Sequence, residues 1–186
     1  IETINESASN ALLKTLEETS SGLFILITQN SEKLLSTIRS RCQIVPFVRL
    51  NNNQVGKIIE KLEIIEEIDD IPSDKIRELI DFSYGSPGQY IINLQSWLSI
   101  SSQLRQKLEI QFTNQIELLQ LAKEITDELN IEQQLWFIDF QQNRAWERKN
   151  DLNIVKRLEE LRKQLLKFVQ PRLAWEVTLL DINLIN

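Results

Sequence analysis

The apolar positions of residues 1–50 alternate between helical stripes and short continuous runs. Apolar residues at helical spacing across 8–16 predict a first helix. Residues 23–27 form a continuous apolar run between polar neighbours, which is typical of a strand buried on both faces. A short helix is predicted over 31–38 and a second strand over 43–48. This part of the chain therefore predicts a mixture of helix and strand.

Two strands do not make a stable sheet by themselves. We therefore expect the missing strands to lie upstream of Ile1. The chain also contains no Met, so we expect it to be the C-terminal part of something longer.

The rest of the chain predicts helices throughout. Residues 51–98 predict three, of which the second starts at Pro72 and stops at Gly85. Ser86 and Pro87 suit the N-cap and first position of the third helix. Five more helices are predicted near residues 99–113, 115–130, 131–149, 152–169 and 171–185. The predicted fold is mainly α, with three domains: an α/β piece at 1–50, three helices at 51–98 and an all-helical domain at 99–186.

Composition excludes several kinds of chemistry. The chain has no His and one Cys, which excludes His-based catalysis, an intrachain disulfide and a Cys-only metal site, so no metal is expected. No apolar run approaches the length needed to span a bilayer, and we expect a soluble, cytoplasmic protein. The net charge of −6 argues against a broad phosphate-binding surface. A local one stays open, because residues 144–172 hold nine basic and four acidic residues.

Three local motifs carry more specific information. They are Asn10-Ala11-Leu12-Leu13-Lys14-Thr15-Leu16-Glu17-Glu18, Thr37-Ile38-Arg39-Ser40-Arg41-Cys42-Gln43 and Gln170-Pro171-Arg172-Leu173-Ala174-Trp175-Glu176. Together and in this order they resemble the bacterial DNA polymerase III clamp loader subunits of the AAA+ superfamily. In that family a Walker A loop, a zinc module and a Walker B strand precede the first motif. None is present here, so the resemblance implies that the chain begins just after Walker B.

The resemblance implies a truncated AAA+ α/β domain at 1–50, a three-helix lid at 51–98 and an oligomerising helical collar at 99–186. The implied function is loading the sliding clamp onto primed DNA in replication, within the DNA polymerase III holoenzyme. The implied partners are the tau/gamma and delta subunits, through the collar and the AAA+ interface, and the clamp and primer-template DNA through the complex.

Arg41 is the strongest candidate for a functional residue. Local sequence alone favours a turn arginine in a surface ion pair. The resemblance implies instead that Arg41 is an arginine finger, which acts in trans on ATP bound by a neighbouring subunit. A planar cation with five donors suits the γ-phosphate and the charge that develops during transfer. Ser40 is expected to orient the turn, and Cys42 to fill core space.

Two further positions, Thr28 and Gly88, concern nucleotide binding. Thr28 matches the polar strand end that senses the γ-phosphate in AAA+ proteins, although a strand that merely ends in polar residues explains it equally well. ATP-hydrolysing siblings carry an arginine near the start of the third lid helix, in a Gly-Ser-x-Arg pattern. Here the segment reads Gly85-Ser86-Pro87-Gly88, with glycine in the arginine position. The chain therefore looks like the delta-prime type, which hydrolyses no ATP and binds no cofactor in this part, while ATP-Mg sits in the siblings.

Two alternatives stay open. One is an ATP-hydrolysing tau/gamma-type subunit, which Gly88 argues against. The other is a stand-alone helical interaction module, which accounts for residues 51–186 but gives the serine–arginine–cysteine turn no purpose.

Overall fold

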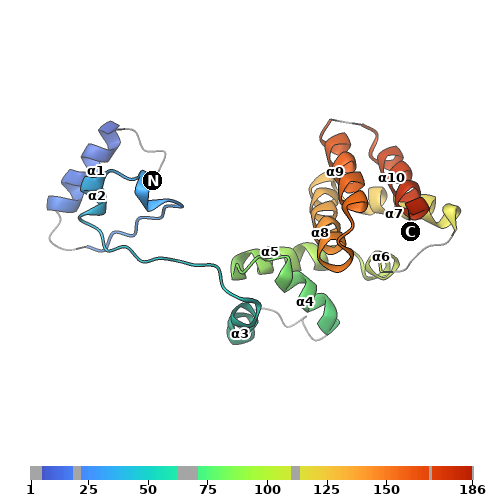
Figure 1. The fold of residues 1–186 in the computed structure, drawn as a ribbon, viewed down its shortest axis with the longest axis horizontal. Helices are drawn as coiled ribbons and strands as arrows, with labels where there is room; N and C mark the ends of the chain where they lie inside the picture. Colours follow the sequence, from blue (N-terminus) through green and yellow to red (C-terminus); the bar gives the residue numbers. More distant parts are fainter. Residues whose placement is uncertain (1–5, 19–21, 63–70, 110–113, 168, 186) are drawn as a thin grey trace. The chain divides into compact units, whose positions relative to one another are not determined.

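The computed structural model describes residues 6–18, 22–62, 71–109, 114–167 and 169–185. The chain divides into two compact units, Ile1–Val48 and Arg49–Asn186, and each is described by itself. Figure 1 shows the helices of both units in sequence colours. None of the described helices is long and apolar enough to cross a bilayer.

The first unit contains α1 (Glu6–Glu18), the short 3-10 helix η1 (Ser31–Lys33) and α2 (Ser36–Arg39). Helices α1 and α2 pack against each other, and Ile38 of α2 is buried. The helix predicted over 31–38 is therefore split. The break lies at Leu34 and Leu35, which have extended backbone with ψ of 148° and 134°.

The two predicted strands are wrong for the described residues. Residues 23–27 and 43–48 have no regular secondary structure, and their side chains are largely exposed. Ile27 is 82% exposed and Phe47 is 95% exposed. A strand exists only where a neighbour completes its hydrogen-bond ladder, and no described segment of this unit pairs with either run. The described residues of this unit therefore do not show the AAA+ α/β piece.

The second unit is built from eight described helices. They are α3 (Asn52–Leu62), α4 (Ser73–Asp81), α5 (Pro87–Leu98), α6 (Ser102–Lys107), α7 (Gln115–Glu128), α8 (Ile131–Lys149), α9 (Leu152–Leu166) and α10 (Pro171–Ile185). The mainly α prediction is confirmed, as are the positions of α7, α8, α9 and α10. Helix α6 is shorter than the prediction over 99–113, because its described part ends at Lys107 and Leu108 caps it.

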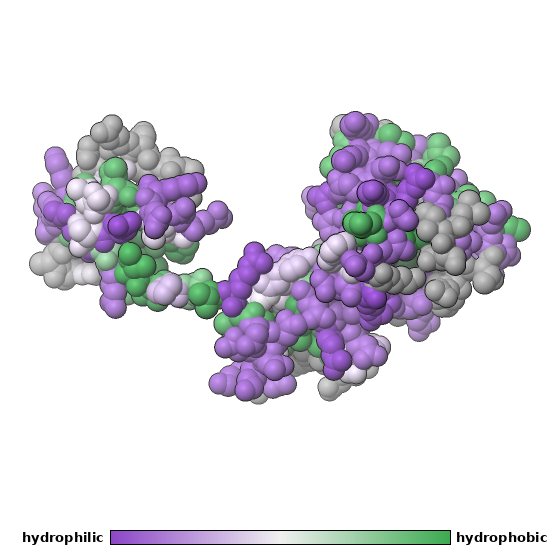
Figure 2. Space-filling view, in the orientation of Figure 1, coloured by the Kyte–Doolittle hydropathy of each residue, from purple (hydrophilic) through white to green (hydrophobic). Residues whose placement is uncertain are grey.

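One continuous hydrophobic core connects these helices, from Val55 in α3 to Trp175 in α10. Helices α7, α8, α9 and α10 pack side by side, with α9 between α8 and α10 and with α10 against α7. Hydrophilic residues cover most of the visible face of these helices (Figure 2). Three of the four Trp residues pack in or against the core, whereas Trp146 is 49% exposed.

The caps of α5 agree with the prediction. The Ser86 hydroxyl accepts a hydrogen bond from the Gln89 amide at 3.2 Å, and Pro87 is the first helical residue. The predicted role of Gly85 as the stop of α4 is wrong, because α4 already ends at Asp81 with Phe82 as its C-cap.

Gly85 instead allows a close crossing of two backbone segments. Its φ is +79°, and its carbonyl accepts a hydrogen bond from the Leu50 amide at 3.1 Å. A Cβ at this position would lie 2.2 Å from the Leu50 carbonyl oxygen. Only glycine fits here, since both the positive φ and the contact exclude a side chain.

We expect Gly85→Ala to lower the free energy of unfolding by roughly 2–4 kcal/mol, because left-handed strain adds to a backbone clash. Urea denaturation followed by circular dichroism measures it. Gly56→Ala is the matched control, since a Cβ on Gly56 in α3 meets nothing within 4 Å and alanine favours a helix. Equal stability of the two variants would contradict the assigned role.

Candidate functional site

The candidate site of the first unit is the turn that follows α2. Ser40 is the C-cap of this helix, with its backbone amide bonded to Ser36 and Ile38 carbonyls, and Arg41 comes next. Ile38 is 3% exposed, and its helix packs against α1. The turn therefore presents Arg41 from a short helix whose apolar residue is anchored.

The Arg41 guanidinium makes two contacts within the described part of the chain. Its Nη2 lies 2.6 Å from Oε1 of Glu17 at the end of α1, and its Nη1 donates to the Thr37 carbonyl at 3.1 Å. The Ser40 hydroxyl donates to the same carbonyl at 3.1 Å. Ser40 and Arg41 therefore both donate hydrogen bonds to the Thr37 carbonyl.

This arrangement holds the guanidinium weakly. The side chains of Arg41 and Glu17 are 41% and 52% exposed, and an ion pair this accessible to water contributes about 0–1 kcal/mol. A more highly charged anion such as a phosphate can therefore displace Glu17 at little cost. The surface ion pair expected from local sequence is present, and the trans-acting role stays a prediction.

Thr28 lies in a separate turn. Its hydroxyl accepts a hydrogen bond from the Asn30 amide at 3.2 Å, and the Asn30 side chain caps η1 through the Glu32 amide at 2.9 Å. Thr28 therefore does not end a strand, and the Arg41 guanidinium contacts do not include it. A nucleotide-sensing role for Thr28 stays a prediction.

Gly88 lies in the first turn of α5. A Cβ built on Gly88 would meet only the Ser86 hydroxyl, at 4.0 Å. Packing therefore leaves room for a Cβ at this position. The backbone around Gly88 does not exclude a Cβ, so the fold does not require glycine here. The position lacks a cation because the sequence has glycine.

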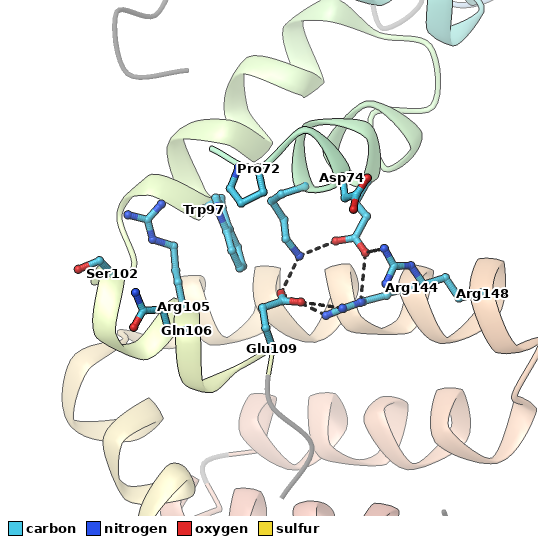
Figure 3. A pocket seen from close by; sticks show the side chains of 11 residues that line it. Pro72, Asp74, Trp97, Ser102, Arg105, Gln106, Glu109, Arg144 and Arg148 are labelled. Carbon is cyan, nitrogen blue, oxygen red and sulfur yellow. Dashed lines mark hydrogen bonds and ion pairs between the residues drawn. The ribbon is translucent and has the colours of Figure 1, made fainter. Parts of the chain in front are cut away.

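The second unit contains a charged cluster that sequence reasoning missed (Figure 3). Lys75 of α4 is 7% exposed, and its ammonium lies 2.5 Å from Glu78 and 2.7 Å from Glu109. Arg144 of α8 pairs with Glu109 at 2.7 Å and with Glu78 at 3.3 Å, and Arg148 also pairs with Glu78. The Lys75 ammonium also lies 4.6 Å from the ring centroid of Trp97. The cluster therefore connects α4 with α8 and with Glu109, which follows α6.

Burial raises the pKa of Glu109, but the hydrogen bonds and charges of Lys75 and Arg144 outweigh burial and leave that pKa below its ordinary value. The lowered pKa determines how the folding stability depends on pH. The stabilisation by Glu109 is present above the carboxyl pKa of the unfolded chain, and it is lost as the pH falls through the lowered value. The cluster consequently stabilises the second unit at neutral pH and weakens in acid.

Known proteins provide an independent comparison. The family model for the cyanobacterial DNA polymerase III delta prime, C-terminal domain, matches residues 50–182. The chain belongs to this delta prime family. The family model for the DNA polymerase III delta subunit matches residues 1–51. The two matches meet at residues 50–51, close to the point after Val48 where the chain divides into its two units.

A curated relative agrees with this assignment. The DNA polymerase III subunit delta' of Pseudomonas aeruginosa is 36% identical over 89 residues, which cover 46% of the chain. The match spans about a quarter of the relative, 25% of its length. No solved structure matches the chain.

Proposed function

We propose that the chain works as a delta-prime-type subunit of the DNA polymerase III clamp loader, which places the sliding clamp on primed DNA. The observation that carries this proposal is the delta prime family match over residues 50–182. The motif around Arg41 supports it from outside that range. In this role the protein assembles with tau/gamma and delta subunits in the bacterial cytoplasm.

Two features define its part in the complex. Arg41 is held by a weak, exposed ion pair, which suits a cation that reaches ATP-Mg in a neighbouring subunit. Gly88 offers no phosphate-binding side chain, which supports a subunit that hydrolyses no ATP itself. The same glycine argues against the tau/gamma-type alternative.

The surface of α10 supports assembly through the C-terminal helices. Leu173 and Val177 are one helical turn apart, and they are 52% and 49% exposed. Leu166 at the end of α9 is 56% exposed. Apolar side chains of this kind lower their free energy by burial against a partner, so we assign this surface to contact with the sibling subunits.

We expect the protein to co-elute with its cognate tau/gamma and delta subunits in size-exclusion chromatography. The double variant Leu173→Asp and Val177→Asp should lose co-elution while its circular dichroism spectrum is unchanged. Ile92→Asp is the matched control, because Ile92 of α5 is 53% exposed and lies outside the collar helices. A wild-type chain that fails to co-elute at micromolar concentration would contradict the proposed function.

A further inference from the structure

A pocket of about 460 Å³ lies where α4, α5, α6 and α8 meet. Its volume falls within the ~300–1,000 Å³ typical of small-molecule sites. Eleven residues line it, among them the charged cluster on one side and Trp97, Ser102, Arg105 and Gln106 on the other. The pocket belongs wholly to the second unit.

Cations exceed carboxylates in this pocket. Four cations line it, Lys75, Arg105, Arg144 and Arg148, against three carboxylates, Asp74, Glu78 and Glu109. This surplus occurs in a chain whose net charge is −6. The local charge thus favours an anion where the protein as a whole does not.

Arg105 differs from the other three cations. Lys75, Arg144 and Arg148 each pair with a carboxylate, whereas Arg105 has no ion pair with any described residue. Its Nε atom is buried and donates to no described acceptor. In Figure 3 no dashed line reaches Arg105, whose guanidinium lies beside Trp97. Its central carbon is 6.0 Å from the Trp97 ring centroid, at the outer limit of a cation–π attraction.

The neighbours of Arg105 add further donors. Ser102 and Gln106 lie three residues before it and one after it on α6, and both line the pocket. A hydroxyl, a guanidinium and a side-chain amide together offer more donors than the two oxygens of a carboxylate can accept. A phosphate group presents three terminal oxygens and forms bidentate pairs with arginine.

We propose that this pocket binds a phosphate group, either as the free ion or as a phosphomonoester, with Arg105 as its principal ligand. Ser102 and Gln106 complete the donor set. The volume exceeds that of the phosphate itself and leaves room for the organic group of a monoester. This inference does not depend on the clamp loader role, because it follows from the pocket alone.

The test is isothermal titration calorimetry of the chain in a phosphate-free buffer at constant ionic strength. The probes are inorganic phosphate, a 5′-phosphorylated dinucleotide, the same dinucleotide without the phosphate, and acetate. Saturable binding of inorganic phosphate assigns the free ion, and binding of the phosphorylated dinucleotide alone assigns a monoester. Binding of neither, or equal binding of acetate or of the unphosphorylated dinucleotide, overturns the proposal.

Substitutions of Arg105 test whether the phosphate binds at this residue. Arg105→Gln should weaken binding at least roughly tenfold, since a charge-assisted hydrogen bond is lost. Arg105→Lys keeps the charge without the planar fork and should fall between that variant and the wild type. Arg77→Gln is the matched control, because Arg77 is exposed on α4 and does not line the pocket. Thermal melts establish that each variant is folded, and unchanged binding by folded Arg105→Gln overturns the assignment.

Discussion

Replacing Arg41 with alanine is expected to lower ATP hydrolysis by the assembled clamp loader while its assembly stays intact. The guanidinium pairs with Glu17 on the surface, so its loss costs about 0–1 kcal/mol of folding free energy. At a neighbouring ATP the loss is larger, because arginine fingers accelerate phosphoryl transfer by roughly 10³–10⁵ in the strongest cases. In the proposed role this subunit serves one of several ATP sites, so we expect a partial loss of total ATPase and a larger loss of clamp loading.

The measurement is the clamp- and DNA-stimulated ATPase of the reconstituted complex. Arg41→Lys should rescue poorly, since an ammonium lacks the planar fork. Arg39→Ala is a matched control, because Arg39 is an exposed arginine two residues earlier in the same motif. If the Arg41→Ala complex assembles and shows normal ATPase and clamp loading, Arg41 is only a surface ion-pair residue.

Truncation of Trp175 to alanine is expected to cost about 3–5 kcal/mol of unfolding free energy. Trp175 is 1% exposed in α10, and its ring lies 6.1 Å from that of Phe137. Its indole Nε1 donates to the Gln134 side chain at 2.9 Å, and Gln134 in turn donates to the Leu129 carbonyl at 2.7 Å. The truncation therefore leaves a cavity and also removes the partner of a buried amide.

Urea denaturation followed by far-ultraviolet circular dichroism measures the change. Trp146→Ala is the matched control, because Trp146 is 49% exposed, and we expect it to change stability by about 1 kcal/mol or less. A Trp175→Ala variant as stable as the Trp146→Ala variant would show that α10 does not complete the core.

The features predicted correctly from the sequence are those that neighbouring residues determine. The N-cap at Ser86 and the start at Pro87 follow from local hydrogen bonding and a fixed φ, and the structure has both. The end of α4 was misplaced for the opposite reason. Gly85 serves a crossing with Leu50, thirty-five residues earlier, and local sequence carries no sign of such a contact.

The two strands were predicted wrongly and the charged pocket was not predicted at all, for a related reason. An apolar run such as residues 23–27 satisfies the composition of a strand, but a ladder requires a partner. The pocket joins residues from four helices, and the sequence shows only the spacing within each helix, such as the i,i+3 pair Lys75 and Glu78. Burial of Lys75 could not be foreseen, because lysine is rarely buried without partners. The role of Arg41 rests on a motif and is still to be tested.

The exposed runs at residues 23–27 and 43–48 have a consequence for handling the chain in solution. Both are rich in β-branched and aromatic residues and lack charge, but Pro46 interrupts the second run, so the full composition of an aggregation-prone strand belongs to residues 23–27. Segments of this composition pair with copies of themselves and nucleate aggregation. Concentrating the isolated chain therefore favours self-association through the first unit, and a charged residue introduced at Ile25 would act as a gatekeeper against it.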